Sequence, residues 1–251
     1  MDDARIYADG RHYDRMFPPS GEILEFCAER ARVARGPVLE LACGSGLLSV
    51  PMARQGFDVT GIDRAPGMLR AARARAEGAG LRVAWHEGDM CDFNLGRRFD
   101  LVLLLSNALC HLLDAQSFES CLRCVRAHLS ERGHFVLSVF VPDPALLRSE
   151  CDEPAPFASY DDPDGAGRIE VTHTYRYEFD TQIKRVTTHH QLPGGEERTG
   201  RLDLRMYFPQ ELDALLRHNG LEIVEKCGAF DGRPFDAKSR LQVVTCRLAA
   251  R

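Results

Sequence analysis

Short apolar runs alternate with helix-like segments over the first 141 residues of the chain. The two kinds of segment are distinguished by the spacing of their apolar residues, which is about two in strands and about 3.6 in helices. Strands are expected at 38–42, 57–62, 81–86, 99–105 and 134–141, and helices at 21–32, 46–55, 66–77 and 115–129. The run at 99–105 is typical of a strand buried on both faces. The alternation predicts an α/β fold with a doubly wound parallel sheet.

The pattern changes after residue 141. Residues 142–168 are rich in Pro, Asp and Gly, and the following segments alternate apolar and polar positions at 168–179, 183–192 and 198–208. This pattern indicates antiparallel hairpins. A helix at 209–219 and strands at 221–227 and 241–248 then complete the chain. We therefore expect an antiparallel β insertion after the fifth strand, near the carboxyl edge of the sheet, where open α/β sheets bind ligands.

The first 20 residues are too few and too polar to form a core of their own. They nevertheless contain several aromatic residues, among them Tyr7, Tyr13 and Phe17. A disordered tail is one interpretation. We favour an N-terminal arm, residues 1–20, that packs over another part of the molecule.

Composition excludes some classes of protein. The formal net charge is −5 and the sequence contains no basic block, which argues against a nucleic-acid partner. No apolar run approaches the length of a membrane span, and the N-terminus does not resemble a signal peptide. We expect a cytoplasmic protein. Its nine cysteines are odd in number and irregularly spaced, so we expect free thiols, and Cys121-x-x-Cys124 is interpreted as two small helix residues.

A glycine turn follows the first strand. Glu40 lies within that strand, and Gly44 and Gly46 follow it before the next helix. Glycines let the backbone turn sharply and let a ligand approach without a Cβ in the way. Asp63 ends the second strand, about 20 residues later, where a doubly wound fold places the acid that binds ribose hydroxyls. The spacing predicts a nucleotide-type ligand, although a Gly-x-Gly turn alone is weak evidence.

Two further segments end strands at the same edge. Asp89 and Met90 follow the third strand, and residues 106–112 (Ser-Asn-Ala-Leu-Cys-His-Leu) follow the fourth. With these segments in place, the sequence resembles the class I S-adenosylmethionine-dependent methyltransferases over about residues 36–141 and 207–248. The segment 106–112 resembles small-molecule N-methyltransferases of the glycine and sugar-amine type. The first glycine of the family's first motif is Ala42 here.

The resemblance implies a seven-stranded Rossmann-like methyltransferase sheet and S-adenosylmethionine as cofactor, with S-adenosylhomocysteine as product. Glu40 would lie near the sulfonium and amino-acid end, Asp63 would accept from the ribose hydroxyls, and Asp89 would accept from the adenine amine. Tyr13 would close over the methionine carboxylate, with Tyr7 as the second candidate. The whole set of cofactor-binding residues that the resemblance implies is Tyr13, Glu40, Ala42, Gly44, Gly46, Asp63, Arg64, Met68, Asp89, Met90, Leu105 and Asn107.

Methyl transfer from a sulfonium is an in-line displacement, so the protein's main task is to align the reactants and exclude water. A base is needed only where the acceptor must lose a proton. His111, just beyond the fourth strand, is the best-placed candidate, and the alternative is an ordinary histidine in a helix cap. No cluster has metal-ligand spacing, and the neighbouring His189 and His190 point to opposite strand faces.

Other candidate residues have plainer interpretations. The inserted hairpins carry His173, His189, His190, Tyr175 and Tyr177. These side chains either line an acceptor pocket or form the solvated face of a strand, and we favour the second. Arg233 either holds an acceptor carboxylate or is a surface residue, and again we favour the second. Asp63 and Asp89 could also act only as turn caps.

The expected organisation is a cofactor-binding domain formed by 1–141 and 207–251, with an inserted lobe at 142–206 that is either a lid or a homodimer interface. The expected function is methyl transfer to a small-molecule amine or hydroxyl. Two alternatives remain open. A nucleotide-cofactor oxidoreductase would need the phosphate-binding Gly-x-Gly-x-x-Gly, but position 49 is Ser. A non-catalytic cofactor-binding protein would not need to retain Glu40, Asp63 and Asp89.

Overall fold

The computed structural model describes residues 5–18, 21–144, 147 and 150–250. Its main sheet contains seven strands in the order β10-β11-β5-β4-β1-β2-β3. The strands are β1 (Val38–Leu41), β2 (Val59–Asp63), β3 (Ala84–Glu87), β4 (Phe99–Leu104), β5 (Leu129–Phe140), β10 (Leu221–Cys227) and β11 (Leu241–Leu248). All neighbours pair in parallel except those of β11, which is antiparallel to both β5 and β10. The predicted doubly wound sheet is confirmed.

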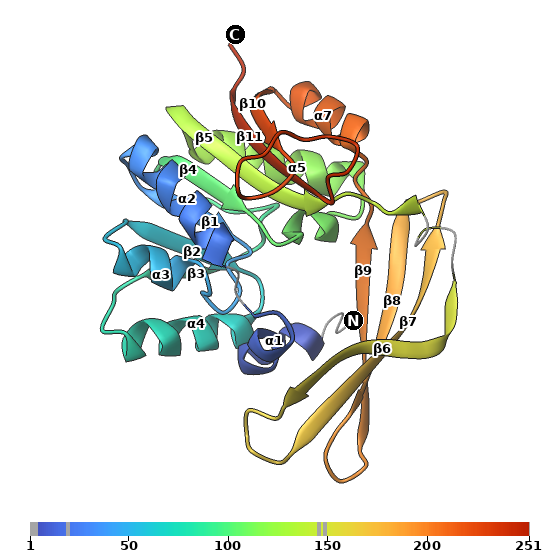
Figure 1. Cartoon of the computed structure of the whole chain (residues 1–251). Coiled ribbons are helices and arrows are strands. Elements are labelled where there is room, and N and C mark those ends of the chain that lie inside the picture. The colour runs from blue at the N-terminus through green and yellow to red at the C-terminus, as the bar shows by residue number, and fades with distance from the viewer. Residues whose placement is uncertain (1–4, 19–20, 145–146, 148–149, 251) are drawn as a thin grey trace.

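Helices cover both faces of this sheet (Figure 1). The helices are α1 (Gly10–Met16), α2 (Gly21–Ala34), α3 (Ser49–Arg54), α4 (Pro66–Gly78), α5 (Ala115–His128) and α7 (Pro209–His218), with 3₁₀ turns η1 (Arg5–Tyr7) and η2 (Ala108–His111). Along β4, Leu101 and Leu103 pack in the cluster that includes α2, whereas Val102 and Leu104 pack in the cluster that includes α5 and α7. This is why the strand is apolar on both faces.

A second sheet follows β5. Its four antiparallel strands, in the order β6-β7-β8-β9, are β6 (Cys151–Asp161), β7 (Arg168–Glu178), β8 (Ile183–Gln191) and β9 (Glu197–Arg205). The predicted antiparallel insertion is therefore confirmed, and below we call it the β lobe. The α1 helix lies between the main sheet and the β lobe and contacts both α4 and β6 (Figure 1).

The strand β6 was not predicted. Its segment contains Pro154, Pro156 and several acidic residues, which obscure the period of two. The strand pairs only with β7, so it forms one edge of its sheet, where prolines are tolerated because half of the backbone N–H groups need no partner. The other boundaries differ from the predicted ones by a few residues, except that β5 begins earlier than expected, at Leu129.

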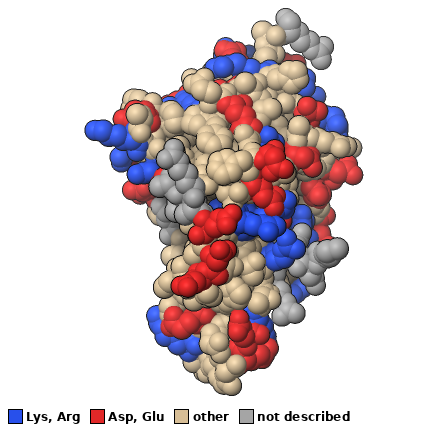
Figure 2. Space-filling model, turned by 90° about the vertical axis from the view of Figure 1, so that its right-hand side faces the viewer, with Lys and Arg blue, Asp and Glu red and all other residues tan. Residues whose placement is uncertain are grey.

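The described helices include none with the length and apolar composition that a membrane crossing requires. On the face of the molecule drawn in Figure 2, acidic and basic side chains lie next to one another and do not gather into one large patch of either sign.

Candidate active site

The loop between β1 and α3 takes left-handed backbone angles at three positions. Ala42, Gly44 and Gly46 have φ of 51°, 57° and 76°. Glycine adopts this conformation without strain, but Ala42 does not, because its Cβ crowds the following carbonyl. A Cβ at Gly46 would also stand 3.0 Å from the ring of Trp85, the single tryptophan of the chain. The loop is thus a tight backbone turn at the carboxyl edge of β1.

Asp63, at the end of β2, holds this loop in place. One carboxylate oxygen accepts from the Gly44 N–H at 2.8 Å and the other from the Ala65 N–H at 2.8 Å. Burial raises the pKa of Asp63. A carboxylate has about four acceptor sites, so two backbone bonds leave capacity for a ligand hydroxyl. The cap that we considered as an alternative is therefore present, and it does not exclude ribose binding.

Glu40 is buried beneath the same loop. Its carboxylate accepts from the Ser49 hydroxyl at the start of α3. Burial raises the pKa of Glu40 to about 8, since desolvation disfavours the charged form and Asp63 adds like charge. A cation placed nearby would reverse this effect. The role of Ser49 was not predicted from the sequence. The sequence did show that position 49 is Ser, where a dinucleotide-binding Gly-x-Gly-x-x-Gly pattern would have its third glycine.

The N-terminal arm is docked against this loop. The Asp14 carboxylate accepts from the Ser45 hydroxyl and from the Arg75 guanidinium of α4, and Arg75 Nε donates to the Ser45 carbonyl at 3.1 Å. Gly10 allows the close approach, because a Cβ there would stand 2.7 Å from that of Ala71. We call these three side chains, Asp14, Ser45 and Arg75, the arm latch. The prediction that the N-terminal segment packs over the site agrees with this geometry.

Tyr7, which belongs to the arm, contacts His111. The Tyr7 hydroxyl lies 3.0 Å from His111 Nε2 and the rings are nearly perpendicular, with centroids 5.6 Å apart. Burial and nearby Arg64 lower the pKa of His111 to about 4, so its imidazole is neutral at pH 7. Burial raises the pKa of Tyr7, so its hydroxyl remains protonated. Tyr13, the first candidate for closing over the cofactor, packs between Tyr7 and Phe17.

Backbone strain marks the end of β4. Ser106 and Asn107 are consecutive residues with φ of 53° and 63°. Such strain persists where surrounding contacts hold it, and it is common at functional sites. Here the Asn107 side-chain oxygen accepts from the Phe140 N–H at 2.9 Å. The Leu105 carbonyl, expected to accept from the methionine ammonium, also accepts from the Ala108 N–H at 3.0 Å.

The remaining predicted positions surround this edge. Asp89 follows β3 and accepts from the Cys91 N–H at 2.8 Å, so it caps a turn with one oxygen. Met90 is half-buried beside the core. Met68 of α4 is buried, and its methyl carbon would lie 3.1 Å from a Cβ at Gly44. The structure therefore brings the predicted residues to one edge of the sheet, around the glycine loop.

Two of the plainer interpretations can be compared with the structure. Arg233 is exposed and bonds Asp231 through its guanidinium, so it is a surface residue, as favoured. The preference for a solvated face at the β7 aromatics was wrong for Tyr177, which is 8% exposed, and His173 and Tyr175 are half-buried on the same side of the strand. This face packs toward the main domain instead of toward solvent.

A group of possible metal ligands joins the arm to the β lobe. His12, Asp162 and Asp164 each offer an atom within 4.8 Å of the others. The sequence could not reveal this group, because the turn that holds both aspartates lies far along the chain from His12. Arg11 Nη1 forms an ion pair with Asp164 at 2.6 Å. The positive charge next to this carboxylate is therefore already supplied by the arginine.

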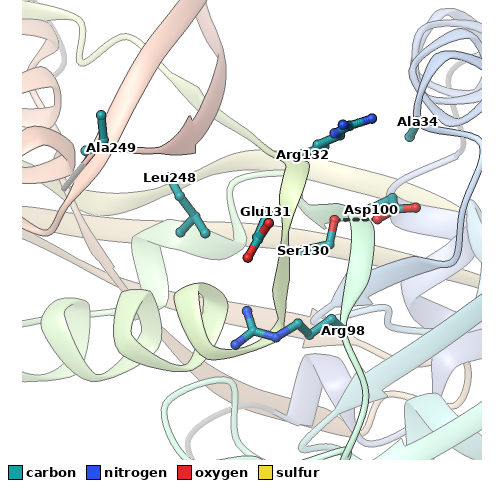
Figure 3. A pocket seen from close by; sticks show the side chains of 9 residues that line it. Ala34, Arg98, Asp100, Ser130, Glu131, Arg132, Leu248 and Ala249 are labelled. Atoms are coloured by element: carbon teal, nitrogen blue, oxygen red, sulfur yellow. Dashed lines mark hydrogen bonds between the residues drawn. The ribbon is translucent and has the colours of Figure 1, made fainter.

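A large open depression lies at the opposite edge of the sheet (Figure 3). It is lined by the starts of β4 and β5 and the end of β11, including Asp100, which accepts a hydrogen bond from Ser130. Parallel α/β sheets bind their ligands at the carboxyl edge, where the glycine loop lies. We therefore assign no role in the chemistry to this depression.

Comparisons with known proteins decide the family. Residues 38–133 match the sequence model of the family described as "Methyltransferase domain". The structure of the CcbJ methyltransferase from Streptomyces caelestis superposes with a TM-score of 0.81 at 27% identity, over 97% of this chain and 98% of that one. Residues 38–133 therefore carry a methyltransferase domain, and the chain has the fold of the methyltransferase structures that it resembles.

Other similar proteins extend the comparison. CalS10 from Micromonospora echinaspora, an amino pentose methyltransferase solved with bound S-adenosylmethionine, is 25% identical over 94% of this chain and 93% of that one, with a TM-score of 0.68. A ubiquinone biosynthesis O-methyltransferase from Azorhizobium caulinodans is 45% identical over 69 residues. That match spans about a quarter (27%) of each protein.

For the methyltransferase domain, these likenesses confirm the family recognised from the sequence, its fold class and S-adenosylmethionine as its cofactor. The roles of the site residues and the identity of the acceptor are argued below from the structure.

Proposed function

We propose that the protein transfers a methyl group from S-adenosylmethionine to the amine of a small molecule. The observation that carries this proposal is the glycine loop with Glu40 beneath it and Asp63 beside it, at the carboxyl edge of a doubly wound sheet. Similar structures that span nearly the whole chain include an amino pentose methyltransferase, which supports an amine acceptor. The cofactor would supply an electrophilic methyl group on a sulfonium.

The residues present fit such a cofactor. Glu40 is a buried carboxyl group whose pKa is raised to about 8, so a positive charge nearby would favour its ionised form. Asp63 offers further acceptor capacity to vicinal hydroxyls. Gly44 and Gly46 leave backbone exposed to close approach, because neither has a Cβ. We assign the sulfonium and methionine end to Glu40 and the ribose to Asp63.

The acceptor's proton would leave through Tyr7 and His111. A protonated amine must first lose a proton, because only the neutral nitrogen has a lone pair that can attack the methyl group. The Tyr7 oxygen can accept that proton while its own proton passes 3.0 Å to His111 Nε2. Both groups are neutral at pH 7, as this relay requires. The docked arm keeps water from the transfer.

A hydroxyl acceptor is the second candidate. It rests on the similarity to a ubiquinone biosynthesis O-methyltransferase over 69 residues, which is about a quarter (27%) of this chain. A hydroxyl must lose its proton during the transfer, so it would depend more strongly on the Tyr7–His111 pair.

The test begins with the cofactor. Trp85 packs against the glycine loop, so its fluorescence should report a titration with S-adenosylhomocysteine. Replacing Asp63 by Ala should weaken binding about 10- to 100-fold, since a charge-assisted hydrogen bond contributes about 1.5–3 kcal/mol. The matched control is Asp58→Ala, which removes an exposed carboxylate that pairs with Arg97.

Unchanged binding in Asp63→Ala would overturn the assigned site, and binding of NAD in place of S-adenosylhomocysteine would overturn the function. Melting curves of each variant establish that it folds. Formation of S-adenosylhomocysteine with a panel of small amines and matched alcohols then distinguishes the two acceptor classes.

A further inference from the structure

The pairing register divides the β7, β8 and β9 side chains between two faces of the β lobe. Tyr177, Tyr175, His173 and Val171 alternate along one face of β7, and their partners on β8 include Lys184 and Thr188. We call this the inner face, because it packs toward the rest of the molecule. At one end Tyr177 packs with Met206 and is joined there by Phe140 and Leu204, and at the other end Val171 and Tyr160 pack with Met16 of α1.

The two faces differ in charge. The carboxylates of β7, β8 and β9 all fall on the outer face by this register, and they are Glu170, Glu178, Glu197 and Asp203. Arg185 of the outer face pairs with two of them. On the inner face the cations are Lys184 and Arg198, and Arg198 pairs with exposed Glu196. Within the described part of the chain, Lys184 forms no ion pair with a carboxylate.

Lys184 lies among aromatic side chains. Its Nζ stands 3.7 Å from the centroid of the Tyr175 ring. His173 packs edge-on against Tyr175 and also contacts Phe157, with centroids 5.4 and 5.1 Å apart. Its Nδ1 is buried and has no hydrogen-bond partner among the described residues. Burial lowers the pKa of Lys184 and of His173, so each would gain from a partner that favours its protonated form.

This cluster lies next to the candidate active site. The cross-strand neighbours of Lys184 are Tyr177 and Leu204. Tyr177 belongs to an apolar cluster against which Leu204 and Phe140, the last residue of β5, both pack. The Phe140 N–H in turn bonds Asn107 at the end of β4, four residues before His111. The inner face therefore meets the main sheet at the carboxyl edge, on the side of His111.

We propose that Lys184 and His173 bind an anionic group, a carboxylate or a phosphate, carried by the methyl acceptor. Lys184 supplies the charge and His173 a second hydrogen bond. Tyr175 and Phe157 pack against an apolar part of the same molecule. The inference rests on the proposed function, which requires a methyl acceptor. It specifies the class of that acceptor: an amine, or a hydroxyl compound, that also bears an acid group.

The lysine content of the chain makes a direct test possible. The sequence contains three lysines, Lys184, Lys226 and Lys238. Protein labelled with ¹³C at lysine Cε gives one NMR signal for each, assigned with Lys→Arg variants. In the presence of S-adenosylhomocysteine, benzoate and phenyl phosphate should shift the Lys184 signal, and benzamide should not, because it has the shape of benzoate without the charge. The stronger of the two anions identifies the acid group.

Variants distinguish a site from a general charge effect. His173→Ala should weaken the binding of benzoate about 10- to 100-fold, as expected for the loss of one hydrogen bond to a charged group. The matched control, His189→Ala, lies on the outer face and should leave binding unchanged. Equal shifts of all three lysines, or an equal shift with benzamide, would overturn the inference. Loss of S-adenosylhomocysteine binding would instead count against the proposed function.

Discussion

At the scale of single residues, one hydrogen bond carries the proton transfer that we propose. Tyr7 and His111 are more than 100 positions apart in the chain, yet their polar atoms lie 3.0 Å apart in a buried setting. The low pKa of His111, about 4, keeps it neutral over the range in which most enzymes work. A neutral imidazole can receive a proton, whereas an imidazolium would repel a cationic amine.

This pair gives a prediction for catalysis. Replacing His111 by Gln, or Tyr7 by Phe, should lower kcat about 100-fold or more, since positioned proton transfer contributes about 10²–10⁴-fold. The Kd for S-adenosylhomocysteine should remain within about twofold, because neither side chain is assigned to the cofactor. Single-turnover rates and fluorescence titrations measure the two effects separately. Equal losses in both quantities would show that the pair only supports the fold.

Some residues of the site could be predicted and others could not. Glu40 and Asp63 follow from their places in apolar strands, since a carboxylate there is costly without a partner. Ser49 supplies part of that partnership and stands where a third glycine was sought. The role of Tyr7 could not be predicted, because the choice between Tyr7 and Tyr13 depends on where the arm crosses the sheet edge.

At the scale of elements, the polar contacts that join the arm to the cofactor-binding domain include a partly exposed ion pair. The arm latch joins α1 to the glycine loop and to α4, and the ion pair within it is partly exposed. Such pairs are each worth about 1 kcal/mol or less. The ion pair of the latch therefore contributes modestly to the docking of the arm.

Loosening the latch should free the arm. Arg75→Ala removes the ion pair to Asp14 and should raise the rate of tryptic cleavage after Arg15 about fivefold, corresponding to about 1 kcal/mol of lost docking energy. Arg73→Ala, an exposed change on the same helix, is the control. The rate constant for loss of intact protein is followed by mass spectrometry. Identical rates in the two variants would mean that the latch does not hold the arm.

Regular elements were easier to predict from the sequence than irregular ones. The strand–helix alternation up to residue 141 reports local periodicity, and it matched the main sheet. The strand β6 was missed because an edge strand tolerates prolines and polar residues, which obscure the apolar–polar alternation that identifies strands. The contacts of the arm were also beyond reach, because they join residues that only the folded chain brings together.

At the scale of the whole molecule, folding changes the proton affinity of the site. The pKa of Glu40 is raised from 4.5 to about 8, so the folded protein retains a proton that the unfolded chain has lost at neutral pH. For such a group the stabilisation is fully present below pH 4.5 and is lost as the pH rises through 8. Buried histidines with lowered pKa values, such as His111, act in the opposite direction, below pH 6.5.

Each such histidine lowers the free energy of unfolding by up to about 0.4 kcal/mol at pH 6.5, so the contribution of Glu40 is read from the difference between the wild-type protein and Glu40→Gln. On lowering the pH from 8 to 6.5, the free energy of unfolding of the cofactor-free wild-type protein should change by about 1–2 kcal/mol more favourably than that of Glu40→Gln. The corresponding difference in the change of Tm should be about 2–8 °C. Glu119→Gln, an exposed change on α5, should behave as the wild-type protein does. Scanning calorimetry measures all three proteins, and a pH dependence unaltered by Glu40→Gln would contradict the burial argument.

The position of α1 between two sheets has a kinetic consequence. The same short helix bonds the glycine loop through Asp14 and touches the β lobe through His12 and Tyr160, whose polar atoms lie 3.3 Å apart. If α1 must move for the spent cofactor to leave and for the next acceptor to enter, both steps depend on the same docked helix. If that helix must undock once in every cycle, its opening rate sets a ceiling on turnover, and a faster methyl transfer alone would not raise it.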